Sequence, residues 1–333
     1  MTTIKEIAAK SGFSPATVSR LLNNDSRLSV TAETKSKILK AANELGYFNK
    51  NRDRINNLKP EIALLYRVNG NEQLQDEYFS FLRDALKKVA KEKNIRLTLF
   101  TEINSLIKQA SIFQGFLGVG TAEVSYTELE KLHKVLPNGV FIDINPAPQI
   151  FDSVQPNLEL TIQDAINKLK AHGYKNLGYI GAESFTLDHQ PQRDIREITF
   201  TEYCRTVGIE NTVVFSGGIV SVKNGYSLAK EVIAKLGRDL PDAFIIASDT
   251  LSVGVLQYFN EIGIRVPRDT AIISINNSEV AEYVSPPLTS YNIDQISLSK
   301  LAISVLLMRI TNTELPRIHV MMNTNLIVRK SFN

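Results

Sequence analysis

The stretch FSPATVSRLLNN, residues 13–24, predicts a short helix close to the N-terminus of the chain. Ser14 is a good N-cap, and Pro15 occupies the first helical position, where its missing N–H loses no hydrogen bond. Three apolar residues then repeat at helical spacing: Val18, Leu21 and Leu22. A helix with one apolar face is therefore expected here, and its first turn consists of small and polar residues.

Apolar residues on either side of this stretch predict two further helices. Ile4, Ile7 and Ala8 share one helical face, and Gly12 permits a tight turn before the next helix. Thr31 can cap a third helix. The inward-facing residues of that helix are Ile38, Ala41, Ala42 and Leu45. The beginning of the chain is thus predicted to be a small three-helix domain.

Basic residues are concentrated in this N-terminal part. Residues 1–59 carry 11 Lys and Arg against 5 Asp and Glu, whereas residues 60–333 carry 27 against 30. A small basic domain on a slightly acidic body favours binding to a polyanion, although uneven surface charge without a partner remains an alternative. We therefore predict a helix-turn-helix DNA-binding headpiece at residues 1–47 and a polar, basic linker at residues 48–60.

The second helix of such a headpiece enters the major groove with its N-terminal residues at the base edges. Small residues allow a close approach, and Pro15 and Ala16 are suited to contact thymine methyl groups. Four neighbours offer hydrogen bonds to bases or phosphates: Ser14, Thr17, Ser19 and Arg20. A plain helical hairpin inside a small bundle would have the same pattern, so the residues alone leave this alternative open.

From residue 61 onward, short apolar runs alternate with helical stretches. The runs extend from EIALLY (61–66) to TAIISI (270–275), and the helices are expected at 76–93, 125–135, 158–172, 222–237, 249–262 and 295–310. Continuous apolar strands separated by helices are typical of parallel sheets covered on both faces. The strands are too many for one sheet, so we predict an α/β core of two doubly wound parallel-sheet subdomains with a ligand cleft between them.

Long stretches resemble the lactose/galactose repressor family of bacterial transcription regulators. The resemblance is carried by TIKEIAAKSGFSPATVSRLLNN (3–24), LSVTAETKSKILKAANELGY (28–47), AHGYKNLGYIG (171–181) and the stretch from ASDTLSVGV to SPPLTS (247–290). It implies a homodimer on a palindromic operator in double-stranded DNA, with a core like that of periplasmic sugar-binding proteins. It also implies that Pro15, Ala16 and Arg20 read bases. Other headpiece residues then lie near bases or phosphates: Thr3, Ser14, Thr17, Ser19 and Asn23.

The resemblance extends to the arrangement of the core, residues 61–333. We expect an N-subdomain at about 61–155 and 292–315, and a C-subdomain at about 156–291 and 316–333. The chain stops shortly after the last core strand without a leucine heptad, so a dimer is expected rather than a tetramer.

The linker departs from the family pattern. The family usually has a Pro and a short hinge helix, whose leucine wedges into the minor groove. The corresponding run here is FNKNRDRINNL (48–58), which lacks the Pro and has Asn56 at the leucine position. We expect Ile55 or Leu58 to supply the wedge. The alternative is a flexible linker that contacts only phosphates.

The family's effectors are mostly sugars, which implies a sugar in the cleft. Similarity to galactose-type repressors of Gram-positive bacteria favours galactose or a galactoside. Arg196 aligns with the family's effector-contacting Arg, with Arg193 as the fallback. Asn276 stands where the family often has Asp and keeps hydrogen-bonding capacity. Asp249 begins a helix, and capping and ligand contact are both open.

Other candidates for the cleft are less specific. Aromatic residues stack on sugar rings, although they are more often core residues. The aromatic candidates are Tyr66, Tyr78 and Phe79. Asn157 and Glu159 occupy the region where the family commonly shows an Asp-Asn pair, which leaves their role uncertain. Tyr283 suits either dimer packing or ligand contact.

Several function classes lack their signatures in this sequence. No dinucleotide-binding, P-loop or nucleophile-elbow motif occurs, and the four His show no metal-ligand spacing. We therefore expect neither enzymatic activity nor a cofactor or metal. Two alternatives remain: a sugar-modifying enzyme tethered to DNA, and a sugar-binding module without operator function. The single Cys204 and the lack of a membrane span or signal peptide predict a cytoplasmic, nucleoid-associated protein.

Overall fold

The structure is a computed structural model. It describes residues 3–22, 28, 30, 31, 34, 37, 38, 41, 42, 45, 60–68, 73–120, 124–185, 190–312 and 314–332. The chain divides into two compact units, one of Met1–Pro60 with Lys93–Ile95 and one of Glu61–Glu92 with Arg96–Asn333.

The N-terminal unit contains helices α1 (Ile4–Ser11) and α2 (Pro15–Leu22). Gly12 ends α1 with φ of 77°, a left-handed conformation that favours glycine. Six buried apolar residues pack together in this unit: Ile7, Ala8, Val18, Ile38, Ala41 and Ala42. The third predicted helix lies largely outside the described residues, but its buried residues belong to this cluster.

The C-terminal unit is built on two six-stranded sheets. The first sheet is parallel throughout, in the order β13-β5-β4-β3-β1-β2. The second has the order β14-β12-β11-β10-β6-β9, in which only β14 runs antiparallel to its neighbour. The strands of the first sheet are β1 (Glu61–Tyr66), β2 (Arg96–Phe100), β3 (Gly115–Val119), β4 (Gly139–Ile142), β5 (Asp152–Pro156) and β13 (His319–Met322). Those of the second are β6 (Asn176–Gly181), β9 (Asn211–Ser216), β10 (Ala243–Ile246), β11 (Ala271–Asn276), β12 (Thr289–Asn292) and β14 (Asn325–Ile327). Strands β7 (Ser184–Phe185) and β8 (Pro191–Gln192) form a separate pair.

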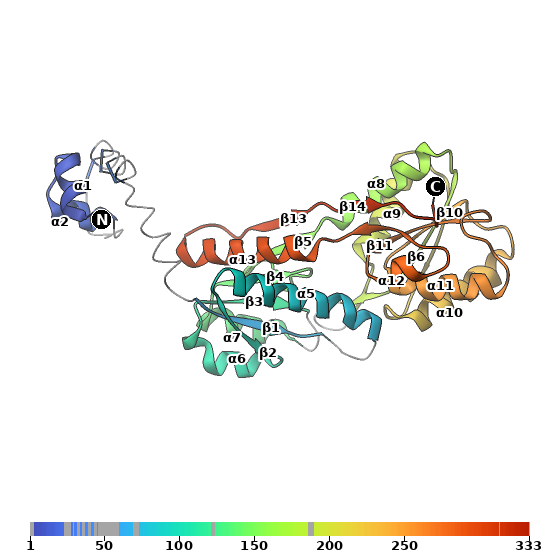
Figure 1. Ribbon diagram of the computed structural model, residues 1–333, viewed down its shortest axis with the longest axis horizontal. Coiled ribbons are helices and arrows are strands. Elements are labelled where there is room, and N and C mark those ends of the chain that lie inside the picture. The colour runs from blue at the N-terminus through green and yellow to red at the C-terminus, as the bar shows by residue number, and fades with distance from the viewer. Residues whose placement is uncertain are drawn as a thin grey trace. The chain divides into compact units, whose positions relative to one another are not determined.

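Helices cover both faces of each sheet, as Figure 1 shows. On the first sheet, α5 (Gln73–Glu92) packs with α13 (Gln295–Thr311), while α6 (Ile103–Gln109) packs with α7 (Tyr126–Val135) on the other face. On the second sheet, α8 (Leu158–Ala171) packs with α9 (Ile195–Thr206), and α10 (Val222–Leu236) with α11 (Asp249–Glu261). The short elements are α12 (Val280–Tyr283) and the 3₁₀ helix Ala110–Ile112. The predicted fold class, a helical headpiece and a core of two doubly wound sheets, is confirmed.

Residues 316–333, which were expected in the C-subdomain, are divided between the two sheets. Strand β14 (Asn325–Ile327) pairs with β12 in the second sheet, but β13 (His319–Met322) pairs with β5 in the first. The reason is a buried ion pair between Arg309 and Asp152, with Nε–Oδ2 at 2.7 Å. Arg309 also donates to the Leu315 and Pro316 carbonyls, and Asp152 accepts from the Ile318 N–H, so the segment before β13 is tied to the first sheet.

No helix within the described parts of the chain is long and apolar enough to cross a membrane.

Candidate functional site

Helix α2 presents the first of two candidate surfaces. Ser14 accepts a hydrogen bond from the Thr17 N–H at 3.1 Å and so caps the helix, as predicted. Val18 is buried in the headpiece core. Four of the predicted DNA-contacting residues are exposed: Ser14, Pro15, Ala16 and Arg20. Thr17 and Ser19 are half-buried. The start of α2 therefore has a solvent-facing side made of small and polar groups and one arginine.

Thr3 is also exposed and caps α1. Its hydroxyl accepts a hydrogen bond from the Glu6 N–H at 3.3 Å, and its own N–H donates to the Glu6 carboxylate at 2.7 Å. This capping box fixes the start of α1. The other predicted DNA contacts, Asn23, Ile55 and Leu58, lie outside the described residues, so the proposed minor-groove wedge stays a prediction.

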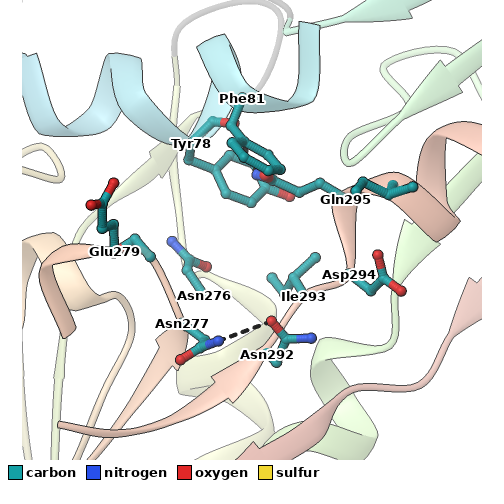
Figure 2. A pocket seen from close by; sticks show the side chains of 11 residues that line it. Tyr78, Phe81, Asn276, Asn277, Glu279, Asn292, Ile293, Asp294 and Gln295 are labelled. Carbon is teal, nitrogen blue, oxygen red and sulfur yellow. Dashed lines mark hydrogen bonds between the residues drawn. The ribbon is translucent and has the colours of Figure 1, made fainter. Parts of the chain in front are cut away.

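A cavity of about 270 Å³ lies in the core at the carboxyl ends of β11 and β12. Figure 2 shows Tyr78 and Phe81 of α5 on one side and Asn276 reaching toward them from the other. The other lining residues are Asn277, Ser278, Glu279, Asn292, Ile293, Asp294, Gln295 and Ile296. Aromatic rings and carboxamides thus face one cavity, which combines a stacking surface with hydrogen-bond donors and acceptors.

The asparagines of this cavity lie in an unusual backbone turn. Asn276 has φ of 110° and Asn277 has φ of 51°, in the region that most side chains avoid. Asn277 Nδ2 donates to Asn292 Oδ1 at 3.1 Å, which joins the ends of β11 and β12. Strained residues of this kind persist only where the surrounding structure enforces their conformation, and they cluster at active sites and ligand-binding sites.

Tyr78 connects the cavity to Asp143, a residue that the sequence analysis missed. The Tyr78 hydroxyl donates to Asp143 Oδ1 at 3.1 Å, and Gln295 Nε2 donates to the Tyr78 carbonyl at 2.9 Å. Asp143 follows β4 directly and has φ of 74°. Burial raises the pKa of both the Tyr78 phenol and the Asp143 carboxyl, and the negative charge of Asp143 raises that of Tyr78 further.

Arg196 lies at the start of α9 and is held by Asp194. Its Nε and Nη2 donate to the two Asp194 carboxylate oxygens at 2.7 and 2.8 Å, and its Nη1 donates to the Ala247 carbonyl at 2.7 Å. Burial alone would raise the pKa of Asp194, but the charge and hydrogen bonds of Arg196 lower it overall. The positive charge of Arg196 also opposes the rise in the pKa of Tyr78 and of Asp143 that burial causes.

Of the predicted effector residues, Tyr78 and Asn276 line the cavity. Phe79 contacts Tyr78 edge-on, with ring centroids 5.1 Å apart. The Arg83 guanidinium lies over the Tyr66 ring, with its Cζ 5.6 Å from the ring centroid. The role of these residues in effector binding stays a prediction.

The remaining predicted residues are engaged in helix termini. Asn157 Oδ1 accepts from the Leu160 N–H at 3.1 Å and caps α8, while the exposed Glu159 accepts from the Gln163 side chain. Of the two roles left open for Asp249, capping and ligand contact, the structure does not have it capping α11. Ser248 is the N-cap, because its hydroxyl accepts from the Leu251 N–H, whereas the Asp249 carboxylate is used elsewhere.

The signal for the missed residues was present but weak. Asp143 directly follows the apolar strand β4, and Asn276 follows the apolar run 270–275 as the last residue of β11. Polar residues at such positions face the cleft of an α/β sheet. Asn292, in contrast, reaches the cavity at the end of β12, a strand too short and polar to be recognised in the sequence, and Gln295 reaches it at the start of α13.

Two family models match the chain. Residues 3–49 match the bacterial regulatory proteins of the lacI family, and residues 166–332 match a periplasmic binding protein-like domain. The HTH-type transcriptional regulator LacR of Lactobacillus helveticus is 54% identical over 332 residues, which cover 100% of this chain and 98% of LacR. The HTH-type transcriptional regulator GanR of Bacillus subtilis is 41% identical over 335 residues, which cover 100% of this chain and 100% of GanR.

Solved structures share the fold. A transcriptional regulator CelR in complex with cellobiose has a TM-score of 0.68 at 22% identity, covering 99% of this chain and 100% of CelR. A lac repressor dimer bound to operator has a TM-score of 0.65 at 18% identity, covering 99% of this chain and 98% of the repressor. Together with the near-complete match to LacR, the matched models establish that the chain belongs to the lacI family of bacterial regulatory proteins.

Proposed function

We propose that this protein is a DNA-binding transcription regulator that represses sugar-utilisation genes. Its operator affinity changes when a small sugar occupies the core cavity. The observation that carries this proposal is the cavity itself, where the Tyr78 and Phe81 rings face the Asn276 carboxamide. Sugars are bound by a ring face together with hydrogen-bonding groups at the hydroxyls. The regulators of similar sequence support the same function.

The ligand that we propose is neutral, namely galactose or a galactoside. Glu279 and Asp294 line the cavity. Asp143 accepts a hydrogen bond from Tyr78, which lines the cavity as well. Two nearby cations are already paired, Arg196 with Asp194 and Arg329 with Glu282. An acidic cavity disfavours phosphorylated sugars, because like charges repel strongly where water is partly excluded. The names LacR and GanR of the relatives, and GalR of a Streptococcus thermophilus regulator that is 34% identical, agree with a sugar-related role.

We propose a homodimer as the working form, with headpiece 1–47, linker 48–60 and core 61–333. A dimer places two headpieces on two operator half-sites, and the symmetry of the operator follows that of the protein. Tyr283 on α12 is 75% exposed and Leu99 on β2 is 45% exposed, which provides apolar surface for a partner. Sugar binding then shifts the population between core conformations and so changes the spacing of the headpieces.

Calorimetric titration with a panel of neutral sugars, phosphosugars and purines tests the ligand. We expect galactose or a galactoside to bind, and the variant Arg196→Lys to bind it about tenfold more weakly or worse, since Lys cannot form the forked contact with Asp194. The matched control is Arg205→Lys on the same helix, because Arg205 is exposed and pairs with Glu202. Binding of a phosphosugar or purine without any response to neutral sugars would contradict the proposed ligand.

A further inference from the structure

A buried carboxylate lies behind the asparagine turn of the cavity. Asp249 has no exposed surface, and it is not among the residues that line the cavity. A buried carboxylate is costly unless hydrogen-bond donors surround it, so its contacts indicate what it stabilises.

The contacts of Asp249 converge on the turn that carries Asn276. Its Oδ2 accepts from the Ser278 N–H at 2.7 Å and from the Ser278 hydroxyl at 3.0 Å. Its Oδ1 accepts from the Ser290 hydroxyl at 2.7 Å. The Ser290 oxygen in turn accepts from the Asn277 N–H at 3.0 Å. Two successive backbone N–H groups of the turn are therefore fixed by Asp249, one directly and one through Ser290.

This turn needs such support because two successive residues have positive φ. Left-handed conformations of residues other than glycine are costly and persist only where the surroundings enforce them. Asn277 is also held from the other side, by Arg329 Nη2 at 2.8 Å from its Oδ1. The Asn276 side chain points into the cavity only as long as this turn keeps its shape (Figure 2).

We propose that Asp249 is a positioning residue of the effector site, which acts on the ligand through Ser278 and Ser290 by holding the Asn276–Ser278 turn. The proposal rests on the cavity being the effector site. Asp249 itself touches no ligand, in contrast to the direct contact that the sequence left open. Its removal should loosen the turn first and weaken ligand binding as a consequence.

The experiment compares Asp249→Asn and the milder Ser290→Ala with the control Asp242→Asn. Asp242 makes the same kind of contact at the other end of the same sheet, where its Oδ2 accepts from the Lys175 and Asn176 N–H groups at 2.7 and 2.9 Å. Hydrogen exchange of peptides that span residues 271–284 reports on the turn. Calorimetry with galactose reports on binding, and DNA affinity without sugar reports on the rest of the molecule.

We expect exchange in the turn to accelerate and galactose affinity to fall by about tenfold in both test variants, the loss that follows from an unsatisfied buried donor. Asp242→Asn should change neither, and DNA affinity without sugar should be unchanged throughout. Unchanged exchange in Asp249→Asn and Ser290→Ala, or an equal loss of galactose affinity in Asp242→Asn, would overturn the positioning role. If galactose does not bind the unaltered protein, the proposed ligand fails, and the exchange measurement still decides the role of Asp249.

Discussion

Asp143 and Asn276 lie at the ends of strands of two different sheets, and both have positive φ. Asp143 begins the loop beyond β4, and Asn276 is the last residue of β11. Asn276 was predicted as a site residue because it follows the apolar run TAIISI (270–275) at a position where the family often has Asp. The contact of Asp143 with Tyr78 depends on packing between residues 65 positions apart, which no local pattern reveals.

The charge of Asp143 should destabilise the fold at neutral pH. Burial raises its pKa above the unfolded value of about 3.9, more than the hydrogen bond from Tyr78 and the charge of Arg196 lower it. Between the unfolded and the folded pKa the native state binds more protons, so stability falls as the pH rises through that window.

Asp143→Asn should therefore raise the midpoint of thermal unfolding by a few degrees at pH 7. Asn keeps an acceptor for the Tyr78 hydroxyl and tolerates the left-handed backbone. The gain should shrink as the pH falls through the raised pKa of Asp143, because protonation then removes the wild-type charge. Scanning calorimetry of both proteins across this range measures the difference. A variant that is less stable at pH 7, or a gain that does not vary with pH, would contradict this interpretation.

At the scale of elements, the apolar strands were predictable because their side chains face helices on both sides. EIALLY, GFLGVG, GVFIDI and TAIISI correspond to β1, β3, β4 and β11. Strand β5 was not recognised, since it begins with Asp152 and Ser153, both fully buried. Its polar start is stabilised by Arg309, which lies 157 residues further along the chain. Buried polar pairs of this kind depend on tertiary structure and leave no periodic pattern.

Helices α1 and α2 should be stabilised mainly by their small apolar cluster. Ile7 is fully buried there, so Ile7→Ala should destabilise the headpiece by about 2–5 kcal/mol. A unit of this size has little stability to spare, and DNA binding should be lost. Sugar binding should be unchanged, because the cavity belongs to the other unit.

Calorimetry with galactose and anisotropy with labelled DNA measure these two effects separately. The exposed neighbour Ala9 offers a control, since Ala9→Ser leaves the cluster intact. DNA affinity retained in Ile7→Ala would mean that DNA binding does not depend on the folded headpiece.

At the scale of the whole molecule, the chain passes between the two sheets after β5, after β12 and after β13. The cavity takes residues from α5, packed on the first sheet, and from the ends of β11 and β12 in the second. A ligand that binds both sides can therefore change their relative arrangement. The sequence could predict the two-sheet core, but neither the effector nor the direction of its influence, because both depend on small differences between conformations.

The binding of a labelled duplex from upstream of the protein's own gene, with and without galactose and at rising salt, tests the proposed function in one assay. We predict sequence-selective binding that weakens steeply with salt, as phosphate contacts require, and an affinity that changes about tenfold or more when galactose saturates the core. Binding that ignores both salt and sequence, or an identical affinity with and without every neutral sugar, would contradict a sugar-responsive DNA-binding regulator.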